Sequence, residues 1–133
     1  MSPENCVLYA DDDADDREMM SDMFAEIPRF HLKTFDSGLA LLGYLERTDP
    51  AQLCFIILDN NMPLMTGYEV LEAIRKMPAF SRTPAVIYTT GTQPDFEPKV
   101  KALGAALVIK PTSLDAIRNA VHHIVDVCTT QPG

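Results

Sequence analysis

Residues 53–58 read LCFIIL and are followed by the polar segment DNN at 59–61. All six side chains of the hexapeptide are apolar, so it lacks the alternation of apolar and polar residues that marks a strand with one face in water. A strand of this kind is buried on both faces, which is typical of a parallel sheet covered by helices on both sides. The segment therefore predicts an α/β fold, with Asp59 at the end of a buried strand.

Four further strand-like runs occur along the chain, and five amphipathic segments alternate with the five runs. The run FHLKTF at 30–35 alternates apolar and polar residues, as an edge strand would. The last helix is expected to begin at Thr112-Ser113, with Asp115 spaced for a capping box from Thr112, and Gly104 is a helix stop signal. Right-handed crossovers then give a (βα)5 arrangement. The predicted strands are 6–10, 30–35, 53–58, 85–89 and 106–109.

Length and charge bound the class of protein. With 133 residues the chain is expected to form a single domain, 1–133, with a core of about residues 5–128 and short flexible ends. The net charge of -8, without a basic stripe, argues against binding to nucleic acid or to an anionic membrane. The N-terminal sequence lacks the features of a signal peptide and no apolar stretch is long enough to span a membrane, which indicates a cytoplasmic protein.

Chemically functional side chains follow four of the predicted strands. They are Asp11 and Asp12 after the first strand, Asp59 after the third, Thr89 at the end of the fourth and Lys110 after the fifth. Ligands of open parallel sheets bind at the carboxyl ends of the strands, where these residues are expected to meet. Clustered carboxylates repel one another unless a cation intervenes, and Mg²⁺ prefers such oxygen ligands. Lys110 supplies a positive charge that neutralises a phosphoryl group or pairs with Asp59 in its absence.

These motifs carry a resemblance to a known family. The segments ADDD at 10–13, FIILDNNMPLMTG at 55–67, VIYTTG at 86–91 and GAALVIKP at 104–111 resemble the receiver domain of two-component response regulators. The resemblance covers essentially the whole chain, and it is greatest to stand-alone receivers such as the chemotaxis response regulator and phytochrome-linked receivers. It implies a doubly wound, flavodoxin-like sheet of five parallel strands in the order 2-1-3-4-5.

The resemblance also implies a role for each site residue. Asp59 is expected to accept a phosphoryl group from a sensor histidine kinase or a histidine phosphotransfer protein. Asp11, Asp12, Asp59 and the backbone carbonyl of Asn61 are expected to hold Mg²⁺, while Thr89 and Lys110 contact the phosphoryl group. Such a protein catalyses its own phosphotransfer and dephosphorylation but is not a dedicated enzyme. It is expected to signal without an attached output domain, by binding an unknown downstream protein or by relaying its phosphoryl group to another histidine, and a homodimer is a further candidate assembly.

Two positions depart from the family pattern. Leu107 stands where receivers commonly have an aromatic ring that takes part in the readout of phosphorylation, and Thr90 stands where they most often have alanine.

The other aspartates at 13–16 are interpreted as a helix N-cap and an acidic first turn rather than as a second metal site. Partner specificity is assigned to surface residues of the first helix, namely Met19, Met20 and Met23.

Two alternative functions remain to be weighed. The first is a receiver-like interaction module that does not need phosphorylation, which the retention of the five site residues disfavours. The second is a phosphatase of the haloacid dehalogenase type, which also places an aspartate after a parallel strand. That chemistry needs a second aspartate two residues further on as general acid, and this chain has Asn61 there, whose amide cannot exchange the proton.

Overall fold

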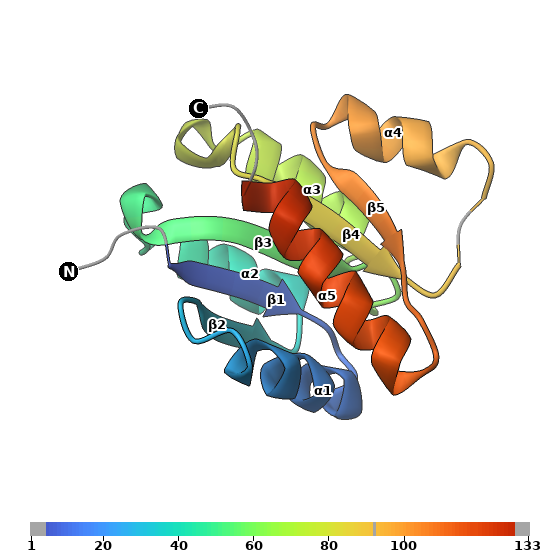
Figure 1. Ribbon diagram of the computed structural model, residues 1–133. Coiled ribbons are helices and arrows are strands. Elements are labelled where there is room, and N and C mark those ends of the chain that lie inside the picture. The colour runs from blue at the N-terminus through green and yellow to red at the C-terminus, as the bar shows by residue number, and fades with distance from the viewer. Residues whose placement is uncertain (1–4, 92, 130–133) are drawn as a thin grey trace.

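The computed structural model describes residues 5–91 and 93–129. Five strands form one parallel sheet: β1 (Cys6–Ala10), β2 (His31–Phe35), β3 (Leu53–Asp59), β4 (Ala85–Thr89) and β5 (Ala106–Ile109). Their order across the sheet is β2-β1-β3-β4-β5 (Figure 1), which confirms the predicted order and the doubly wound, flavodoxin-like fold. The predicted flexible ends, 1–4 and 129–133, lie outside the described residues except for Thr129, which is the last residue of α5 (Leu114–Thr129).

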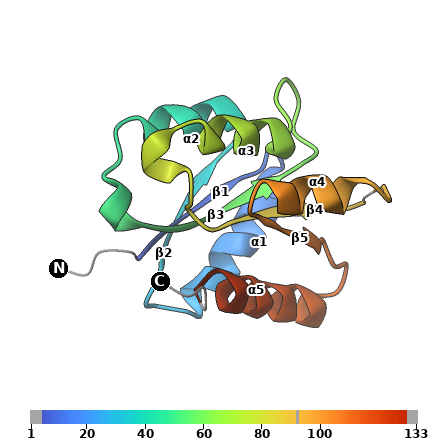
Figure 2. The ribbon, with the colours of Figure 1, turned by 90° about the horizontal axis from the view of Figure 1, so that it is seen from above.

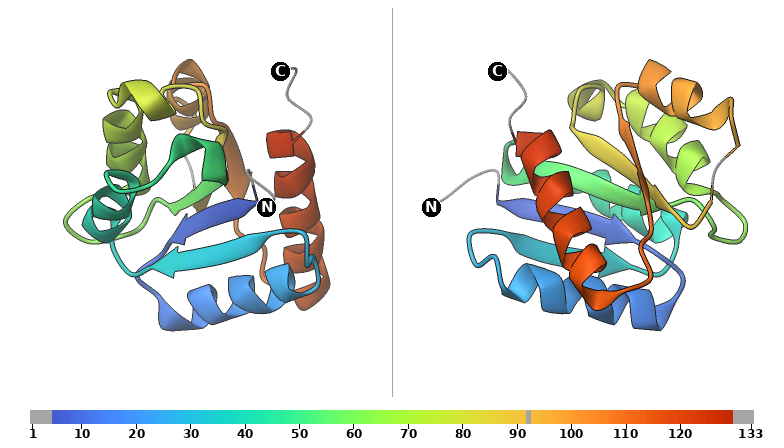
Figure 3. Two further views of the ribbon diagram at one scale, coloured as in Figure 1. Left: turned by 90° about the vertical axis from the view of Figure 1, so that its left-hand side faces the viewer. Right: turned by 45° about the vertical axis from the view of Figure 1, so that its right-hand side comes forward.

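Helices cover both faces of the sheet. They are α1 (Ala14–Ala25), α2 (Gly38–Leu45), α3 (Gly67–Arg75), α4 (Phe96–Ala102) and α5 (Leu114–Thr129). Helices α1 and α5 lie on one face, while α2 and α3, with α4 beside them, lie on the other (Figure 2, Figure 3). Two short 3₁₀ turns, η1 (Pro50–Gln52) and η2 (Pro78–Phe80), precede β3 and β4. The sheet is therefore buried between two helical layers, as the LCFIIL run predicts.

The two faces of the sheet carry separate hydrophobic cores. In β1 the side chains alternate, so Val7 and Tyr9 belong to the core under α1 and α5, whereas Leu8 and Ala10 belong to the core under α2 and α3. Strand β3 contributes fully buried residues to both cores, which explains its unbroken apolar run. The edge strand β2 is half exposed, as its alternating sequence predicts.

The register of the strands brings the predicted site residues to one edge. Asp11 follows β1 and Asp59 ends the neighbouring β3, and the residues just before these two aspartates are paired across the sheet. On the other side of β3, Thr89 ends β4, and the Lys110 N–H donates to the Thr89 carbonyl at 2.7 Å. All four residues therefore lie at the carboxyl edge of the sheet.

The helix ends follow their sequence signals with one exception. Gly104 ends α4 with φ at 73°, a left-handed conformation that glycine adopts without strain. The capping box predicted from Thr112 to Asp115 is wrong, because α5 begins at Leu114 and Ser113 caps it. The Ser113 hydroxyl accepts the Ala116 N–H at 3.2 Å. Thr112 lies in the bend after β5, one residue too early to cap the first turn.

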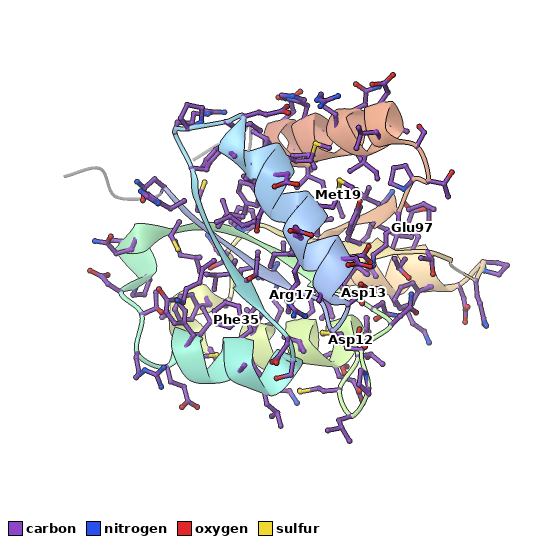
Figure 4. The ribbon with its side chains drawn as sticks, turned by 90° about the horizontal axis from the view of Figure 1, so that it is seen from below. Asp12, Asp13, Arg17, Met19, Phe35 and Glu97 are labelled. Carbon is purple, nitrogen blue, oxygen red and sulfur yellow. The ribbon has the colours of Figure 1, made fainter. Side chains whose placement is uncertain are left out.

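Helix α1 buries more of its methionines than the sequence interpretation allows. Met20 and Met23 are 2% and 4% exposed and belong to the core beneath the helix, because their spacing places both on the face that meets the sheet. Their interpretation as surface residues that contact a partner is therefore wrong. Met19 is partly exposed on the same helix (Figure 4).

Candidate functional site

Three buried polar residues lie at the carboxyl edge of the sheet. Asp11, Asp59 and Thr89 are at most 2% exposed, and within the ranges 5–91 and 93–129 they are the buried residues that are polar or charged. Lys110 reaches the same edge from the segment after β5, with a side chain that is 10% exposed. The structure thus brings together the four residues that sequence reasoning assigned to the ends of four different strands.

Asp12 joins Asp11 and Asp59 in an acidic cluster. One carboxylate oxygen from each of the three residues lies within 4.8 Å of the others. Asp12 is exposed and precedes α1, where Figure 4 shows it beside Asp13. Burial and then repulsion from Asp11 raise the pKa of Asp59 to about 6, although Lys110 and the Asn61 N–H act in the opposite direction. A cation held by the cluster relieves this repulsion.

The donor set of the cluster fits Mg²⁺. That ion takes oxygen ligands, and it usually combines one or two carboxylates with water and phosphate oxygens. The Asn61 N–H donates to Asp59 Oδ1 at 3.3 Å, so the loop after β3 turns back onto the carboxylate and keeps the backbone of Asn61 beside the cluster. The residues that the sequence analysis assigned to the metal are therefore neighbours.

Lys110 pairs with three carboxylates. Its Nζ lies 2.8 Å from Asp16, 2.9 Å from Asp11 and 3.2 Å from Asp59. Burial lowers the pKa of Lys110, but hydrogen bonds to Asp16 and Asp11 outweigh burial, and the net effect raises this pKa. The lysine is therefore positively charged and uses its three N–H donors on three partners. The predicted pairing with Asp59 is present and is the longest of the three.

Asp11 receives donors on both of its carboxylate oxygens. The Tyr9 hydroxyl and Lys110 Nζ donate to Oδ2, while the Asp13 N–H donates to Oδ1 at 2.9 Å. The Arg17 guanidinium, labelled on α1 in Figure 4, donates to the backbone carbonyl of Asp11 at 2.8 Å. Asp11 is thus the most densely hydrogen-bonded carboxylate of the cluster, which is why it tolerates complete burial.

A second group of polar side chains lies beside Thr89. The Thr89 hydroxyl donates to the Gly91 carbonyl at 3.1 Å. The Asn61 side-chain amide donates to Thr90 Oγ1 at 3.0 Å and lies 3.5 Å from Thr89 Oγ1. Thr90, which departs from the family pattern, therefore holds the side chain of Asn61. A cleft of about 510 Å³ opens here, lined by Asn60, Asn61, Thr90, Gly91, Phe96 and Lys99 among others.

The loop from β3 to α3 is held close to Asp59 by its own hydrogen bonds. The Asn60 side chain accepts the Tyr68 N–H at 2.9 Å, which ties the loop to the first turn of α3. Within the loop, Leu64 has φ at 69° and the Met65 N–H donates to the Pro63 carbonyl at 2.7 Å, so Leu64 is the centre of a γ-turn. The Leu64 side chain is 99% exposed.

Lys110 lies close to the aromatic ring of Tyr88. The Tyr88 side chain belongs to the core under α1 and α5, and Lys110 Nζ lies 5.6 Å from the centre of its ring. Leu107, where an aromatic is common, packs partly buried against the opposite core. The aromatic residues beside the site are therefore Tyr88 of β4 and Tyr9 of β1, and neither comes from β5.

Sequence reasoning missed two residues of the site. Asp16 was interpreted as part of an acidic first turn, and Tyr9 as an ordinary strand residue, but Asp16 pairs with Lys110 and Tyr9 donates to Asp11. The cap interpretation is confirmed for Asp13, whose carboxylate accepts the N–H groups of Asp15 and Asp16. A usable signal for Asp16 was its place in the first turn of a helix that starts directly above the strand ends. Tyr9 carried the signal of a hydroxyl two residues before a buried carboxylate, on a strand that is otherwise apolar.

Comparison with protein families agrees with this geometry. A sequence model described as the response regulator receiver domain matches residues 7–122. The chain belongs to the response regulator receiver family. Receivers of this family accept phosphoryl groups in two-component signalling, so the receiver described here is a phosphoaccepting signalling domain.

Individual relatives place the receiver among proteins of different length. It is 29% identical over 136 residues to the two-component response regulator ARR17 of Arabidopsis thaliana, a match that covers 95% of this chain and 88% of the relative. It is 32% identical over 117 residues to a protein of Vibrio cholerae named as a probable cyclic di-GMP phosphodiesterase, which covers 87% of this chain but 25% of that protein. The receiver therefore spans about a quarter of this second relative.

Solved structures share the fold. The chemotaxis protein CheY4 of Vibrio cholerae is 28% identical and superposes with a TM-score of 0.76, covering 90% of this chain and 97% of CheY4.

Among the described residues of the receiver, no helix combines the length and the apolar character that crossing a bilayer requires.

Proposed function

We propose that this receiver accepts a phosphoryl group on Asp59 from a phosphorylated histidine, with Mg²⁺ held by Asp11, Asp12, Asp59 and the backbone carbonyl of Asn61. The observation that carries the proposal is the position of Asp59, which is 2% exposed yet lies beside two carboxylates and 3.2 Å from Lys110. Burial of a carboxylate in such surroundings destabilises the fold, so stability does not explain its presence. A nucleophile that acts together with a bound cation and a phosphoryl group does explain it.

The chemistry follows from the placement of the side chains. A carboxylate oxygen of Asp59 attacks phosphorus while the bond from phosphorus to the histidine nitrogen breaks, and the released imidazole takes up a proton. The product is an acyl phosphate on Asp59. Phosphoryl transfer depends on alignment and on neutralisation of the oxygens that carry charge. Bound Mg²⁺ would supply part of that neutralisation.

Lys110 and Thr89 supply the remaining contacts to the phosphoryl group. Lys110 already lies beside Asp59, so it exchanges a carboxylate oxygen for a phosphoryl oxygen with a small movement of Nζ. The Thr89 hydroxyl donates to the Gly91 carbonyl and turns from that bond to the incoming group. Because both residues are buried at the strand ends, they need little rearrangement to act.

Intact-protein mass spectrometry after incubation with acetyl phosphate tests the proposal. The wild type is expected to gain one phosphoryl group in Mg²⁺ but not in EDTA, and hydroxylamine is expected to remove it. Asp59→Asn is expected to gain none, whereas Asp22→Asn, which alters an exposed aspartate of α1, retains the reaction. A wild type that binds no Mg²⁺ and takes no phosphoryl group from acetyl phosphate or a histidine donor favours the phosphorylation-independent module.

The proposal also defines the partners. The donor is a sensor histidine kinase or a histidine phosphotransfer protein, and the phosphorylated receiver acts by binding a downstream protein or a second copy of itself. Receivers of this family are typically cytoplasmic, and we propose the same compartment for this one. The receiver turns over its own modification rather than a separate substrate. Light scattering with and without beryllofluoride, an analogue of the phosphoryl group, tests the homodimer.

A further inference from the structure

Tyr9 is the fourth of the five residues of β1, two residues before Asp11, and is 0% exposed. Its ring packs in the core under α1 and α5, where it meets the ring of Tyr88 edge to face at a centroid distance of 6.4 Å. A buried phenol needs an acceptor for its hydroxyl, because leaving the hydroxyl without one is costly. The acceptor is Oδ2 of Asp11. One hydroxyl group thus connects the apolar core with the acidic cluster.

The hydroxyl of Tyr9 differs from the other donor to the same oxygen. Lys110 Nζ lies 2.9 Å from Asp11 Oδ2, but it is shared with Asp16 and Asp59 and, in the proposed function, moves to the phosphoryl group. Tyr9 is enclosed on all sides and has one hydrogen-bonding group, which has no second acceptor among the contacts of the described residues. It is therefore the permanent donor to this oxygen, while Lys110 is an exchangeable one.

The other oxygen of Asp11 is held separately. Oδ1 accepts the Asp13 N–H at 2.9 Å, close to the N-terminus of α1. With Tyr9 on one oxygen and the Asp13 N–H on the other, the plane of the carboxylate is set even when Lys110 leaves. Donors that orient a ligand in this way commonly decide how tightly a metal binds, since a ligand that rotates freely must be ordered when the ion arrives.

We propose that Tyr9 is a positioning residue of the metal site, whose buried hydroxyl holds the Asp11 carboxylate in the orientation that supports a divalent cation beside Asp12 and Asp59. The inference rests on the proposed metal site and extends it to a residue of the hydrophobic core. Loss of an orienting donor of this kind typically weakens metal binding about 10- to 100-fold, and an effect in that range is expected for Tyr9→Phe.

Isothermal titration of the purified chain with Mg²⁺ tests the proposal on Tyr9→Phe, which removes only the hydroxyl. The matched control is Tyr88→Phe, which removes a hydroxyl from the neighbouring buried ring and leaves Asp11 untouched. The melting temperature of each variant is first measured in EDTA. The Mg²⁺ titrations are then run without EDTA, at a temperature below both melting temperatures. If Tyr9→Phe is too unstable, all proteins carry Gly43→Ala, whose added methyl group meets no atom within 4 Å.

The outcomes separate the inference from the proposed function. About tenfold or greater weakening in Tyr9→Phe, with Tyr88→Phe within about twofold of the wild type, supports the positioning role. An unchanged Kd in Tyr9→Phe, or equal weakening in both variants, overturns it while the wild type still binds Mg²⁺. A wild type that does not bind Mg²⁺ removes the proposed metal site itself, and the inference with it.

A double-mutant cycle distinguishes a positioning role of Tyr9 from a purely structural one. It compares the effect of Tyr9→Phe on the Kd for Mg²⁺ with and without the Asp11 carboxylate. In the Asp11→Asn background, Tyr9→Phe is expected to alter the Kd for Mg²⁺ by less than about twofold, because the carboxylate that it orients is gone. Independent, additive effects of the two substitutions on the Kd contradict the proposal.

Discussion

Asp59 lies under opposing electrostatic influences. Burial and the neighbouring Asp11 raise its pKa from 3.8 to about 6, whereas Lys110 favours the ionised form. The folded protein therefore binds a proton on Asp59 more tightly than the unfolded chain does. For the metal-free protein, this difference disfavours the folded state progressively as the pH rises from about 4 to about 6.

Asp59→Asn is accordingly expected to stabilise the metal-free protein at neutral pH. The gain is expected to be about 1–2 kcal/mol above pH 7 and to disappear toward pH 3, below both pKa values, where the wild-type carboxyl is largely protonated in both states. Urea denaturation in EDTA across this pH range measures the effect. A difference between the two proteins that does not change with pH would show that the ionisation of Asp59 is not its cause.

Asp16 is a second residue whose charge has a specific partner. Asp16→Asn removes the shortest of the three Lys110 contacts and is expected to lower the free energy of unfolding by about 0.5–1 kcal/mol, because the aspartate is 42% exposed and partly screened. The loss is expected to shrink at high salt. Urea denaturation at two salt concentrations measures it. Asp15→Asn is the control, because Asp15 lies in the same first turn of α1 and interacts with the same helix dipole. An equal loss of unfolding free energy in Asp15→Asn would show that the ion pair with Lys110 is not the cause.

At the scale of the elements, the start of α3 is pressed against the end of β3. A Cβ on Gly67 would lie 2.5 Å from the carbonyl oxygen of Asp59 and 2.9 Å from its carbonyl carbon. These are backbone atoms of the strand that carries the site, so they move only if the helix or the strand tip moves. The position needs glycine for close approach rather than for an unusual φ angle.

Gly67→Ala is therefore expected to destabilise the fold by about 1–3 kcal/mol and to slow the gain of mass with acetyl phosphate, because it displaces Asp59. Gly43→Ala in α2 is the matched control. Its methyl group meets open space within a helix, so it is expected to stabilise by about 0.5–1 kcal/mol and to leave the reaction unchanged. Thermal melts and mass spectra of the two variants make the comparison. Equal melting temperatures would refute the close contact.

The elements also show how far the sequence alone could go. The five strands and their edge residues were predictable, because apolar runs and the polar residues after them are local patterns. The cap of α5 was assigned to the wrong one of two adjacent hydroxyl residues, Thr112 instead of Ser113, which differ only in where the chain bends. Met20 and Met23 were misassigned because the apolar stripe of α1 was taken for surface, although its period points to the sheet.

For the site, prediction succeeded for residues at strand ends and failed for residues that reach it from elsewhere. Asp11, Asp59, Thr89 and Lys110 meet because parallel strands end at one edge. Asp16 reaches Lys110 from a helix, and Tyr9 reaches Asp11 from within the core, so both depend on side-chain directions in three dimensions. The hydrogen bond from the Asn61 side chain to Thr90 Oγ1 likewise joins two loops. No local sequence pattern predicts that these loops lie close together.

For the whole molecule, the proposed metal site predicts that cation binding is coupled to folding. Residues from the ends of β1 and β3 and from the approach to α1 must be together to bind a divalent ion, and the unfolded chain does not hold them so. Mg²⁺ at about 100 times its Kd is thus expected to stabilise the fold by about 2.7 kcal/mol, which appears as an increase in melting temperature of several degrees.

Asp12→Asn is expected to abolish most of this Mg²⁺-dependent increase, while it leaves the metal-free melting temperature little changed because Asp12 is exposed. Thermal melts in EDTA and in Mg²⁺, with Asp22→Asn as the control, measure the difference. If Asp12→Asn and the wild type gained equally from Mg²⁺, the ion would be acting elsewhere on a chain whose net charge is -8.

The γ-turn at Leu64 leads to a different kind of consequence. A leucine with φ at 69° and a side chain 99% exposed is neither relaxed in its backbone nor sheltered from water, and Leu64→Asn is expected to raise the free energy of unfolding by about 1 kcal/mol in urea denaturation. The backbone at this corner thus favours a residue other than the one it carries. A redesign that sought only thermostability would replace this leucine early, and in doing so it would change the loop that leads from Asp59 to α3.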